Sequence, residues 1–406
     1  MPAQGVEESH PSRFSTRSRA APFLGLFQLA SDRIIIVGAG IIGLGIGWRL
    51  ARAGRDVLIF DRDRAGQAAS RASAGMLTPL AEVRHEEEAL LRLGLKGLEQ
   101  FPDFVAELES DSGMSVGYRP DGVLLVGVTR DDIEYLRFRY DYQRDLGLPV
   151  EWMSGGQARA REPQLSPQVG AAVWCPGDHQ VDNRLMVKAL RRAFLKAGGS
   201  LMESTPVETI HVAQDRVRGI VAGNKAYQAA TIILAAGCWS RLIPGLPGPA
   251  RPPVRPVRGQ ILRLQMTEDC TVKTIVWYNR AASSAVAYLC PKDGGHLVLG
   301  ATSEEMGFDD GLTAGGIFEL LRAAWEVVPG IYDLPIIETA AGLRPGSRDD
   351  APILGNTPIH GLIMATGHYR KGILLAPITA YAIAELVLNG NTSEDIRPFG
   401  IGRFAA

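Results

Sequence analysis

The fold of this chain is decided by a stretch that reads Arg33-Ile34-Ile35-Ile36-Val37-Gly38-Ala39-Gly40-Ile41-Ile42-Gly43, continues from Leu44 to Gly54, and ends Val57-Leu58-Ile59-Phe60-Asp61. The first apolar run is short and β-branched, which is typical of a strand buried in a parallel sheet. Glycines in the pattern G-x-G-x-x-G follow, then a helical segment, then a second apolar strand that ends on an acid. This order predicts a Rossmann-like βαβ unit.

Each part of this unit has a role in a dinucleotide site. Gly38 allows the tight turn after the strand, Gly40 lets a pyrophosphate approach the backbone, and Gly43 lets the helix pack on the strand. Free N–H groups at the helix N-terminus attract phosphates. Asp61 ends the second strand, where a carboxylate accepts hydrogen bonds from ribose hydroxyls. The stretch therefore predicts a dinucleotide site rather than an ordinary glycine-rich turn.

The composition is that of a globular enzyme. Hydrophobic residues make up 46% of the 406 residues, enough to bury large cores. The net charge of −1 gives no reason to expect a nucleic-acid partner, and no apolar run is long enough for stable membrane insertion. We expect no metal site and a reducing, cytoplasmic location, because the cysteines are scattered and show no zinc spacing. They are expected to be mostly buried thiols: Cys175, Cys238, Cys270 and Cys290.

Three further segments favour FAD as the dinucleotide. The loop of residues 62–77 is rich in Ala and Ser and can lie flat against a cofactor. A second buried strand from Thr231 to Leu234 ends in small residues up to Gly237, a pattern that often marks strand tips at the central phosphates of flavoproteins. Gly372 and the helix expected from about Leu374 to Leu388 can direct N–H groups at the electron-rich edge of a flavin ring.

The remaining segments predict a second domain interleaved with the first. Residues 1–32 are expected to be a disordered tail. The FAD-binding domain is expected to comprise residues 33–90, 170–250 and 340–395, with a mainly parallel sheet. Residues 91–169 and 251–339 carry several expected strands and are expected to form an antiparallel-sheet substrate domain. The fold class is therefore α/β combined with α+β, and helical spacing from Glu86 to Leu108 marks the start of the inserted second domain.

The C-terminal part carries two arginines suited to a carboxylate substrate. Arg344 lies in an apolar glycine-proline turn, and its planar guanidinium matches a carboxylate with two parallel hydrogen bonds. A buried arginine without an anion is costly, so Arg344 requires a partner, either a substrate or a structural acid such as Asp349. Arg370 is either a second site residue or a helix-start residue bound to backbone. Tyr288 is either a pocket residue or a core residue of a strand.

Together these motifs resemble those of glycine oxidases of the thiamine-biosynthetic type, within the D-amino-acid oxidase superfamily of flavoenzymes. The resemblance covers roughly residues 33 to 390. The motifs that carry it are Gly38-Ala39-Gly40-Ile41-Ile42-Gly43, Ser73-Ala74-Gly75-Met76-Leu77, Gly300-Ala301-Thr302, Gly342-Leu343-Arg344-Pro345-Gly346 and Gly367-His368-Tyr369-Arg370-Lys371-Gly372-Ile373-Leu374. Relatives that bind flavin covalently use a cysteine, and the C-terminal motif has none, so noncovalent FAD is implied.

The resemblance also implies the roles of particular residues. Arg344 is expected to hold the substrate carboxylate, Arg370 to lie at the flavin and the substrate, and Tyr288 to close the pocket. No side chain is strictly required as a catalytic base. Ser303 occupies a position that can hold methionine in the family, which leaves the substrate range open. FAD is expected to contact Gly38, Gly40, Ile41, Ile42, Gly43, Asp61, Arg62, Ala69, Ser70, Ala74, Gly75, Met76, Val207, Gly237, His368, Tyr369, Arg370, Lys371, Gly372, Ile373 and Leu374.

The reaction implied is oxidative deamination of glycine, and of sarcosine or small D-amino acids, by hydride transfer to the flavin. It yields an imino acid, then glyoxylate and ammonia, while molecular oxygen reoxidises the flavin and gives hydrogen peroxide. The imino acid of glycine supplies the thiazole of thiamine, and the family suggests a homotetramer. Two alternatives stay open: a dehydrogenase of D-amino acids or amines that passes electrons to a quinone or partner protein, and a catalytically silent flavoprotein.

Overall fold

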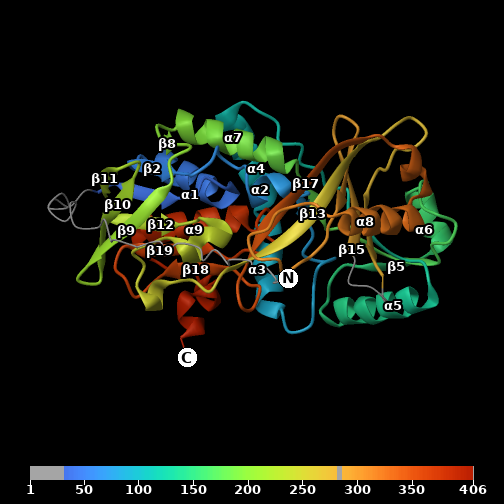
Figure 1. The fold of residues 1–406 in the computed structure, drawn as a ribbon. Helices are drawn as coiled ribbons and strands as arrows, with labels where there is room; N and C mark the ends of the chain where they lie inside the picture. Colours follow the sequence, from blue (N-terminus) through green and yellow to red (C-terminus); the bar gives the residue numbers. More distant parts are fainter. Residues whose placement is uncertain (1–31, 281–285, 406) are drawn as a thin grey trace, which may run out of the picture.

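A six-stranded sheet lies behind the glycine pattern. The structure, a computed structural model, describes residues 32–280 and 286–405 (Figure 1). The strand order is β18-β19-β12-β1-β2-β8, and all neighbours are parallel except β18 and β19. The strands are β1 (Ile34–Val37), β2 (Val57–Phe60), β8 (Ser200–Met202), β12 (Thr231–Leu234), β18 (Ile353–Asn356) and β19 (Leu362–Thr366). Burial on both faces explains why β1, β2 and β12 are almost wholly apolar.

Helices cover one face of this sheet, and a small antiparallel sheet covers the other (Figure 1). The helical layer holds α1 (Ile41–Arg52), α7 (Asn183–Lys196) and α9 (Ala376–Asn389). The second layer holds β9 (Val207–Ala213), β10 (Arg216–Ala222) and β11 (Lys225–Gln228). A separate hydrophobic cluster fills each interface. The predicted Rossmann-like architecture is therefore confirmed.

The glycine pattern forms the turn between β1 and α1, and its glycines differ in what they require. A Cβ at Gly38, where φ is +109°, lies 2.4 Å from the carbonyl oxygen of Ala235. A Cβ at Gly43 lies 1.9 Å from the carbonyl oxygen of Gly38. Gly40 has an ordinary φ of −73°, and a Cβ there meets only Ser70 Oγ, at 3.4 Å. The fold itself therefore requires Gly38 and Gly43, whereas Gly40 leaves room in front of the turn.

An eight-stranded sheet forms the second half of the molecule, in the order β17-β13-β16-β15-β14-β4-β6-β5. Its neighbours are antiparallel except β4 and β14, so the predicted antiparallel sheet contains one parallel pair. α8 (Ala314–Val327) packs on one face and α5 (Arg130–Asp145) on the other. The strands are β4 (Val123–Gly127), β5 (Glu151–Ser154), β6 (Ala171–Cys175), β13 (Arg255–Gln265), β14 (Ile275–Asn279), β15 (Val286–Lys292), β16 (His296–Gly300) and β17 (Ile336–Gly346).

The division into two domains remains a proposal. The structure places β6 in the eight-stranded sheet, although it falls within the range 170–250 expected for the FAD-binding domain. The end of β17 falls within the range 340–395 and pairs with β13 in the same sheet. The expected ranges therefore assigned both strands to the wrong sheet, and the end of β17 carries Arg344 to the cavity wall.

Several element boundaries were predicted well and others were not. α7 begins directly after Asp182, whose carboxylate accepts hydrogen bonds from the N–H groups of Arg184 and Leu185, as expected of an N-cap. The helical spacing from Glu86 to Leu108 is divided into α3 (Glu88–Glu99) and α4 (Phe101–Ser112), because a proline occupies the first turn of α4. The tail expected at residues 1–32 lies outside the described residues, except for Asp32.

Two further expectations concern the whole chain. The four cysteines are unpaired and buried, as predicted. Within residues 32–280 and 286–405, none of the helices combines the length and the apolar character needed to cross a bilayer.

Candidate active site

A cavity of about 400 Å³ lies between the two large sheets, in front of the turn that joins β1 to α1. Its walls include the carboxyl ends of β1, β2 and β12, the position where open α/β sheets bind ligands. The opposite wall comes from β13, β14, β15 and β17 of the eight-stranded sheet. The cavity therefore has a nucleotide end and an end that faces the eight-stranded sheet.

The cavity brings together most of the predicted site residues. Those that line it are Arg344, Arg370, Tyr288, Gly38, Gly40, Ile41, Ile42, Asp61, Arg62, Ala69, Ser70, Ala74, Met76, Val207, Gly237, His368, Tyr369, Gly372 and Ile373. Four predicted residues lie behind this lining: Gly43, Gly75, Lys371 and Leu374. Gly75 turns the chain at φ +73°, where a Cβ lies 2.0 Å from the carbonyl oxygen of Val181. Lys371 faces Glu82 instead.

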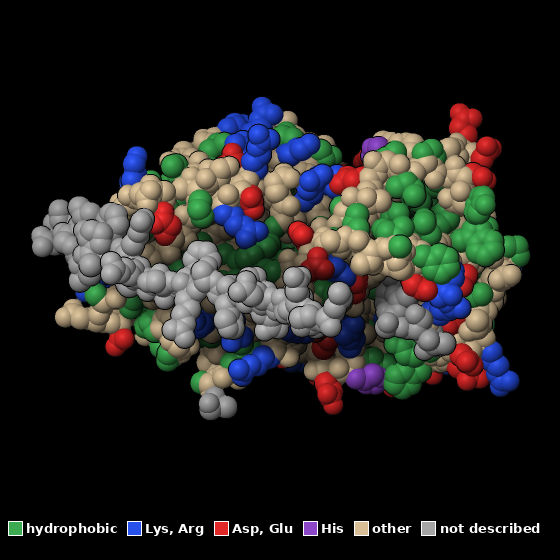
Figure 2. All heavy atoms as spheres, in the orientation of Figure 1, with side chains coloured by type: hydrophobic (Ala, Val, Ile, Leu, Met, Phe, Trp, Pro, Cys, Tyr) green, Lys and Arg blue, Asp and Glu red, His purple; other side chains and the backbone are tan. Residues whose placement is uncertain are grey.

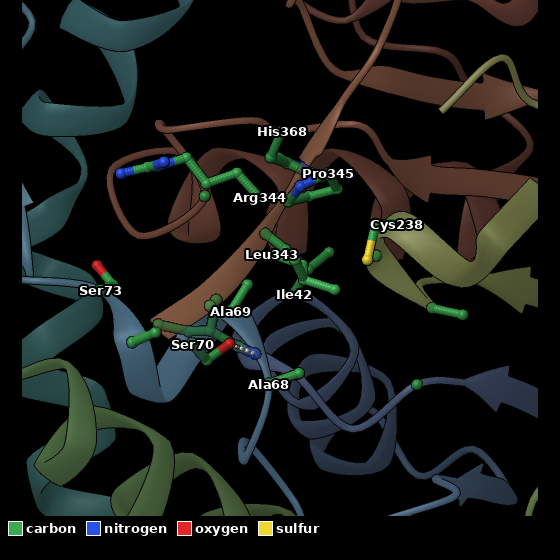
Figure 3. A pocket seen from close by; sticks show the side chains of 18 of the residues that line it. Ile42, Ala68, Ala69, Ser70, Ser73, Cys238, Leu343, Arg344, Pro345 and His368 are labelled. Atoms are coloured by element: carbon green, nitrogen blue, oxygen red, sulfur yellow. Dashed lines mark hydrogen bonds between the residues drawn. The ribbon is translucent and has the colours of Figure 1, made fainter. Parts of the chain in front are cut away.

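Backbone donors and one carboxylate form the nucleotide end. Ser70, in the short helix α2 (Ala69–Ala72), accepts a hydrogen bond from the N–H of Ile41 at 3.0 Å (Figure 3). Asp61 accepts bonds from the N–H groups of Ala39, at 2.6 Å, and Asp63, at 2.9 Å. Burial raises the pKa of Asp61, and these backbone donors oppose that rise. The position of Asp61 at the tip of β2 fits the predicted contact with a ribose.

Arg62 and Trp239 form a further part of the wall at this end. The Arg62 guanidinium lies 3.7 Å from the centre of the Trp239 ring, a cation–π contact. Trp239 lies in the 3-10 helix η2 (Gly237–Leu242), directly after the small residues that end β12. Sequence reasoning included Arg62 but missed its aromatic partner, because the two are far apart in the chain.

Arg344 projects from β17 into the opposite end of the cavity (Figure 3). Its Nη1 donates to the backbone carbonyls of Thr302, at 3.0 Å, and Arg258, at 3.2 Å. Gly259 leaves space for the guanidinium, since a Cβ there lies 2.3 Å from it. Burial lowers the pKa of Arg344, yet a guanidinium stays charged in proteins.

No carboxylate of the described residues forms a salt bridge with Arg344. The structural partner considered from the sequence, Asp349, instead pairs with Arg403 at 2.7 Å. Five N–H donors belong to a guanidinium, and the two protein contacts of Arg344 use only Nη1. The remaining donors face a cavity that has room for an anion, so this cation is suited to a carboxylate ligand.

Arg370 and Gly40 show that the cavity fits FAD. Arg370 Nε is buried and has no hydrogen-bond partner among the described residues. A buried donor without a partner is costly, so a ligand with acceptor atoms stabilises it. At the other end, the space in front of Gly40 lies at the N-terminus of α1, where N–H groups attract phosphates. These two features match the polar edge of a flavin ring and a pyrophosphate.

Tyr288 and Trp277 narrow the end of the cavity that contains Arg344. Their rings lie 5.9 Å apart on adjacent strands β15 and β14. Burial raises the pKa of Tyr288 above its ordinary value, so its hydroxyl is neutral and able to donate. Elsewhere in the lining, Ser303 Oγ lies 3.5 Å from the hydroxyl of Tyr369. Tyr288 therefore lines the cavity as well as belonging to a buried strand.

His368 is buried beside the cavity, 3% exposed, and its Nε2 lies 3.1 Å from Thr379 Oγ1. Burial lowers the pKa of His368 to about 3, so the imidazole is neutral at physiological pH. It can therefore offer a hydrogen bond near a flavin but no positive charge.

The same burial makes His368 a source of pH-dependent stability. The pKa of His368 is lower in the folded state than its ordinary value near 6.5, so below that value the unfolded chain binds a proton that the folded protein does not. The free energy of unfolding is therefore highest above the ordinary pKa and falls as the pH drops below it. Between pH 7.5 and pH 5 we expect a loss of about 2 kcal/mol from this group. His368→Gln lacks this titration, so urea unfolding at the two pH values is expected to show a smaller loss than in the parent. Equal losses in both proteins would contradict this assignment.

Sequence reasoning missed Glu82, an acid that lines the cavity near Arg344 and Tyr288. Glu82 follows the predicted turn at Met76 by only a few residues, and this proximity was the available signal. Its importance depends on Lys371, which is distant in sequence and lies 3.4 Å from it.

The chain belongs to the family of FAD dependent oxidoreductases: the sequence model of that family matches residues 33–386. It is similar to the glycine oxidase of Geobacillus kaustophilus (strain HTA426), with 33% identity over 91% of this chain and 96% of that protein. The crystal structure of glycine oxidase from Geobacillus kaustophilus matches with a TM-score of 0.84 at 32% identity, over 92% of this chain and 99% of that one. The bifunctional protein ThiO/ThiG of Synechocystis sp. is 35% identical over 93% of this chain, which spans 54% of that protein.

Proposed function

We propose that this protein is an FAD-dependent glycine oxidase. One observation carries the proposal: Arg344 is a half-buried cation without a carboxylate partner in the described residues, and it faces the cavity that fits FAD. A substrate with a carboxylate completes this site, and glycine is the smallest amino acid that has one. The similarity to glycine oxidases over nearly the whole chain supports the same substrate.

Different residues around the cavity contact different parts of the substrate and the flavin. Arg344 holds the substrate carboxylate, Tyr288 closes the pocket beside it, and Arg370 lies between substrate and flavin. Bound FAD supplies a ring that accepts a hydride from the substrate α-carbon. The protein contributes orientation and exclusion of water, because it fixes the α-carbon at one position. No acid–base pair of side chains is needed for this step.

Sarcosine and small D-amino acids are proposed as further substrates. Ser303 and Tyr369 line the cavity with their hydroxyls 3.5 Å apart, and the small polar Ser303 leaves more space than a methionine would at that position. The space beside Ser303 therefore limits the size of the group on the α-carbon or on the amine.

Molecular oxygen is the proposed electron acceptor, with hydrogen peroxide as a product. In air, we expect the purified protein to form peroxide and glyoxylate from glycine in equal amounts, which a coupled peroxidase assay and a keto-acid assay measure. Formation of glyoxylate only when a quinone is added would support the alternative, a dehydrogenase. The similarity to proteins named oxidases does not favour that alternative.

We also propose that the protein is a homo-oligomer. Figure 2 shows hydrophobic side chains gathered over the region of α8, and large apolar residues there are exposed: Phe318 60%, Trp325 50%, Tyr332 82%, Ile336 50% and Ile337 48%. Exposed apolar patches of this kind mark interaction surfaces. Light scattering that gives a mass near 43.7 kDa, the mass of one chain, would contradict this proposal.

A place in thiamine biosynthesis and a cytoplasmic location complete the proposal. The similarity to the ThiO part of a ThiO/ThiG protein supports supply of an oxidised glycine for the thiazole. The unpaired thiols are suited to a reducing compartment. Cell fractionation measures the location, and thiamine-dependent growth of a deletion strain measures the pathway role.

A further inference from the structure

Glu82 is the acidic side chain at the substrate end of the cavity. The described lining contains two other acids, Asp61 and Asp63, and both lie at the nucleotide end beside β2. The side chain of Glu82 is only 10% exposed. Burial is the largest influence on the pKa of Arg344 and of Tyr288, and the charge of Glu82 acts on both. Glu82 lines the same cavity as Arg344 and Tyr288, and its ion pair with Lys371 places it beside the segment that carries Arg370.

The carboxylate of Glu82 is kept ionised by its neighbours. Burial by itself raises the pKa of Glu82, but the cations of Lys371 and Arg370 and the hydroxyl of Thr78 outweigh burial, so the pKa lies below its ordinary value. Lys371 Nζ lies 3.4 Å from Oε2, and Thr78 Oγ1 donates to Oε1 at 3.0 Å. A carboxylate has about four lone-pair sites, so it can accept further hydrogen bonds from a ligand.

Hydrogen bonds to three other residues fix the backbone that carries Glu82. Asp178 accepts the N–H groups of Leu80, at 3.0 Å, and Ala81, at 2.8 Å. Gln143 of α5 donates to the carbonyl of Leu80 at 2.8 Å. The N–H of Glu82 itself donates to the carbonyl of Thr78 at 3.1 Å. These bonds fix the position of a buried charge, which is the arrangement that orientation of a ligand requires.

We propose that Glu82 accepts a hydrogen bond from the α-amino group of the substrate while Arg344 holds its carboxylate. The inference rests on the proposed function, and it adds the group that distinguishes an amino acid from a simple carboxylic acid. Arg344, Arg370 and Lys371 alone make this end strongly positive, which repels an ammonium and favours any carboxylate. Glu82 offsets that charge at one point and offers an acceptor there.

The test compares glycine with propionate, in which a methyl group replaces the amine. In Glu82→Gln we expect the half-saturating glycine concentration for anaerobic flavin bleaching to rise about 10- to 100-fold, the usual effect of losing a hydrogen bond to a charged group. Propionate binding, measured from the shift of the flavin spectrum, is expected to stay the same or become tighter. Glu134→Gln, which changes an exposed acid on α5, is the matched control and is expected to change neither ligand.

Thr78→Val provides a second variant that keeps the Glu82 carboxylate and removes its Oε1 partner. A smaller loss of glycine affinity, again without loss of propionate affinity, is expected. Equal weakening of glycine and propionate in Glu82→Gln would overturn the inference, because it would show that Glu82 only supports the pocket. Unchanged glycine saturation would overturn it as well.

The outcome of this test separates Glu82 from the proposed function. Glycine that displaces propionate from the parent without bleaching the flavin would contradict the proposed oxidase. If glycine then no longer displaced propionate from Glu82→Gln, while propionate itself bound this variant as tightly as the parent, the contact between Glu82 and the amine would still be supported. Bleaching of both proteins at the same glycine concentration would support the oxidase and overturn the role of Glu82.

Discussion

Arg344→Ala is expected to keep its fold and its FAD but to lose nearly all reaction with glycine at ordinary concentrations. The guanidinium donates to two backbone carbonyls and has donors left over for a ligand. Removing one partner of a buried charge pair costs roughly 2–5 kcal/mol, and each 1.4 kcal/mol is a factor of ten. The half-saturating glycine concentration is therefore expected to rise by roughly 30- to 3,000-fold, as measured by anaerobic flavin bleaching.

Two matched variants make this result specific. Arg344→Lys keeps a charge but loses the planar pair of donors, so its effect is expected to be intermediate. Arg348→Ala removes a neighbouring exposed arginine and is expected to change nothing. If Arg344→Ala were saturated by glycine as easily as the parent, Arg344 would not be the carboxylate anchor.

Gly40→Ala is expected to fold normally and to lose FAD. Gly40 has an ordinary φ, and a Cβ there meets no protein backbone atom within 4 Å, so the protein alone tolerates the change. The added methyl group occupies the place where a pyrophosphate approaches the helix N-terminus. Loss of one or two hydrogen bonds to a charged phosphate, at about 1.5–3 kcal/mol each, lowers FAD affinity by about 10-fold to 10⁴-fold.

The measurement is the flavin content after dialysis, together with the thermal unfolding of the flavin-free proteins. Gly40→Ala and the parent are expected to unfold at the same temperature without FAD. Gly43→Ala is the contrasting variant, because its Cβ lies 1.9 Å from the carbonyl oxygen of Gly38 and disrupts the turn itself. Full FAD retention in Gly40→Ala would contradict the placement of the pyrophosphate.

The nucleotide end could be read from the sequence because its parts are local. The strand, the glycines, the helix and Asp61 follow one another, and periodicity identifies each of them. The Asp182 cap and the cysteine burial were also local matters of pattern and composition. Arg344 was found because a charged residue in an apolar glycine-proline segment is unusual at any position, but the expected turn was wrong, since Arg344 lies within strand β17 and pairs with Val257 of β13.

The substrate end could not be read completely because it is assembled from distant segments. Glu82 contacts Lys371, and Arg62 contacts Trp239. The two members of each pair are far apart in the sequence, and no sequence motif has a spacing that links them. Strand β13 lies beside β17, so a side chain at Gly259 would occupy the place of the Arg344 guanidinium. Only this pairing shows why a glycine is needed there. Strand pairing over long separations decides such contacts, and single-sequence periodicity does not determine that pairing.

The central claim is that glycine, anchored in this cavity, delivers its electrons to FAD and then to oxygen. Anaerobic mixing of the yellow holoprotein with glycine, followed by admission of air, tests it most directly. Bleaching of the flavin by glycine and rapid return of the colour in air, with formation of peroxide, is the predicted result. A flavin that stays oxidised at saturating glycine would contradict the claim.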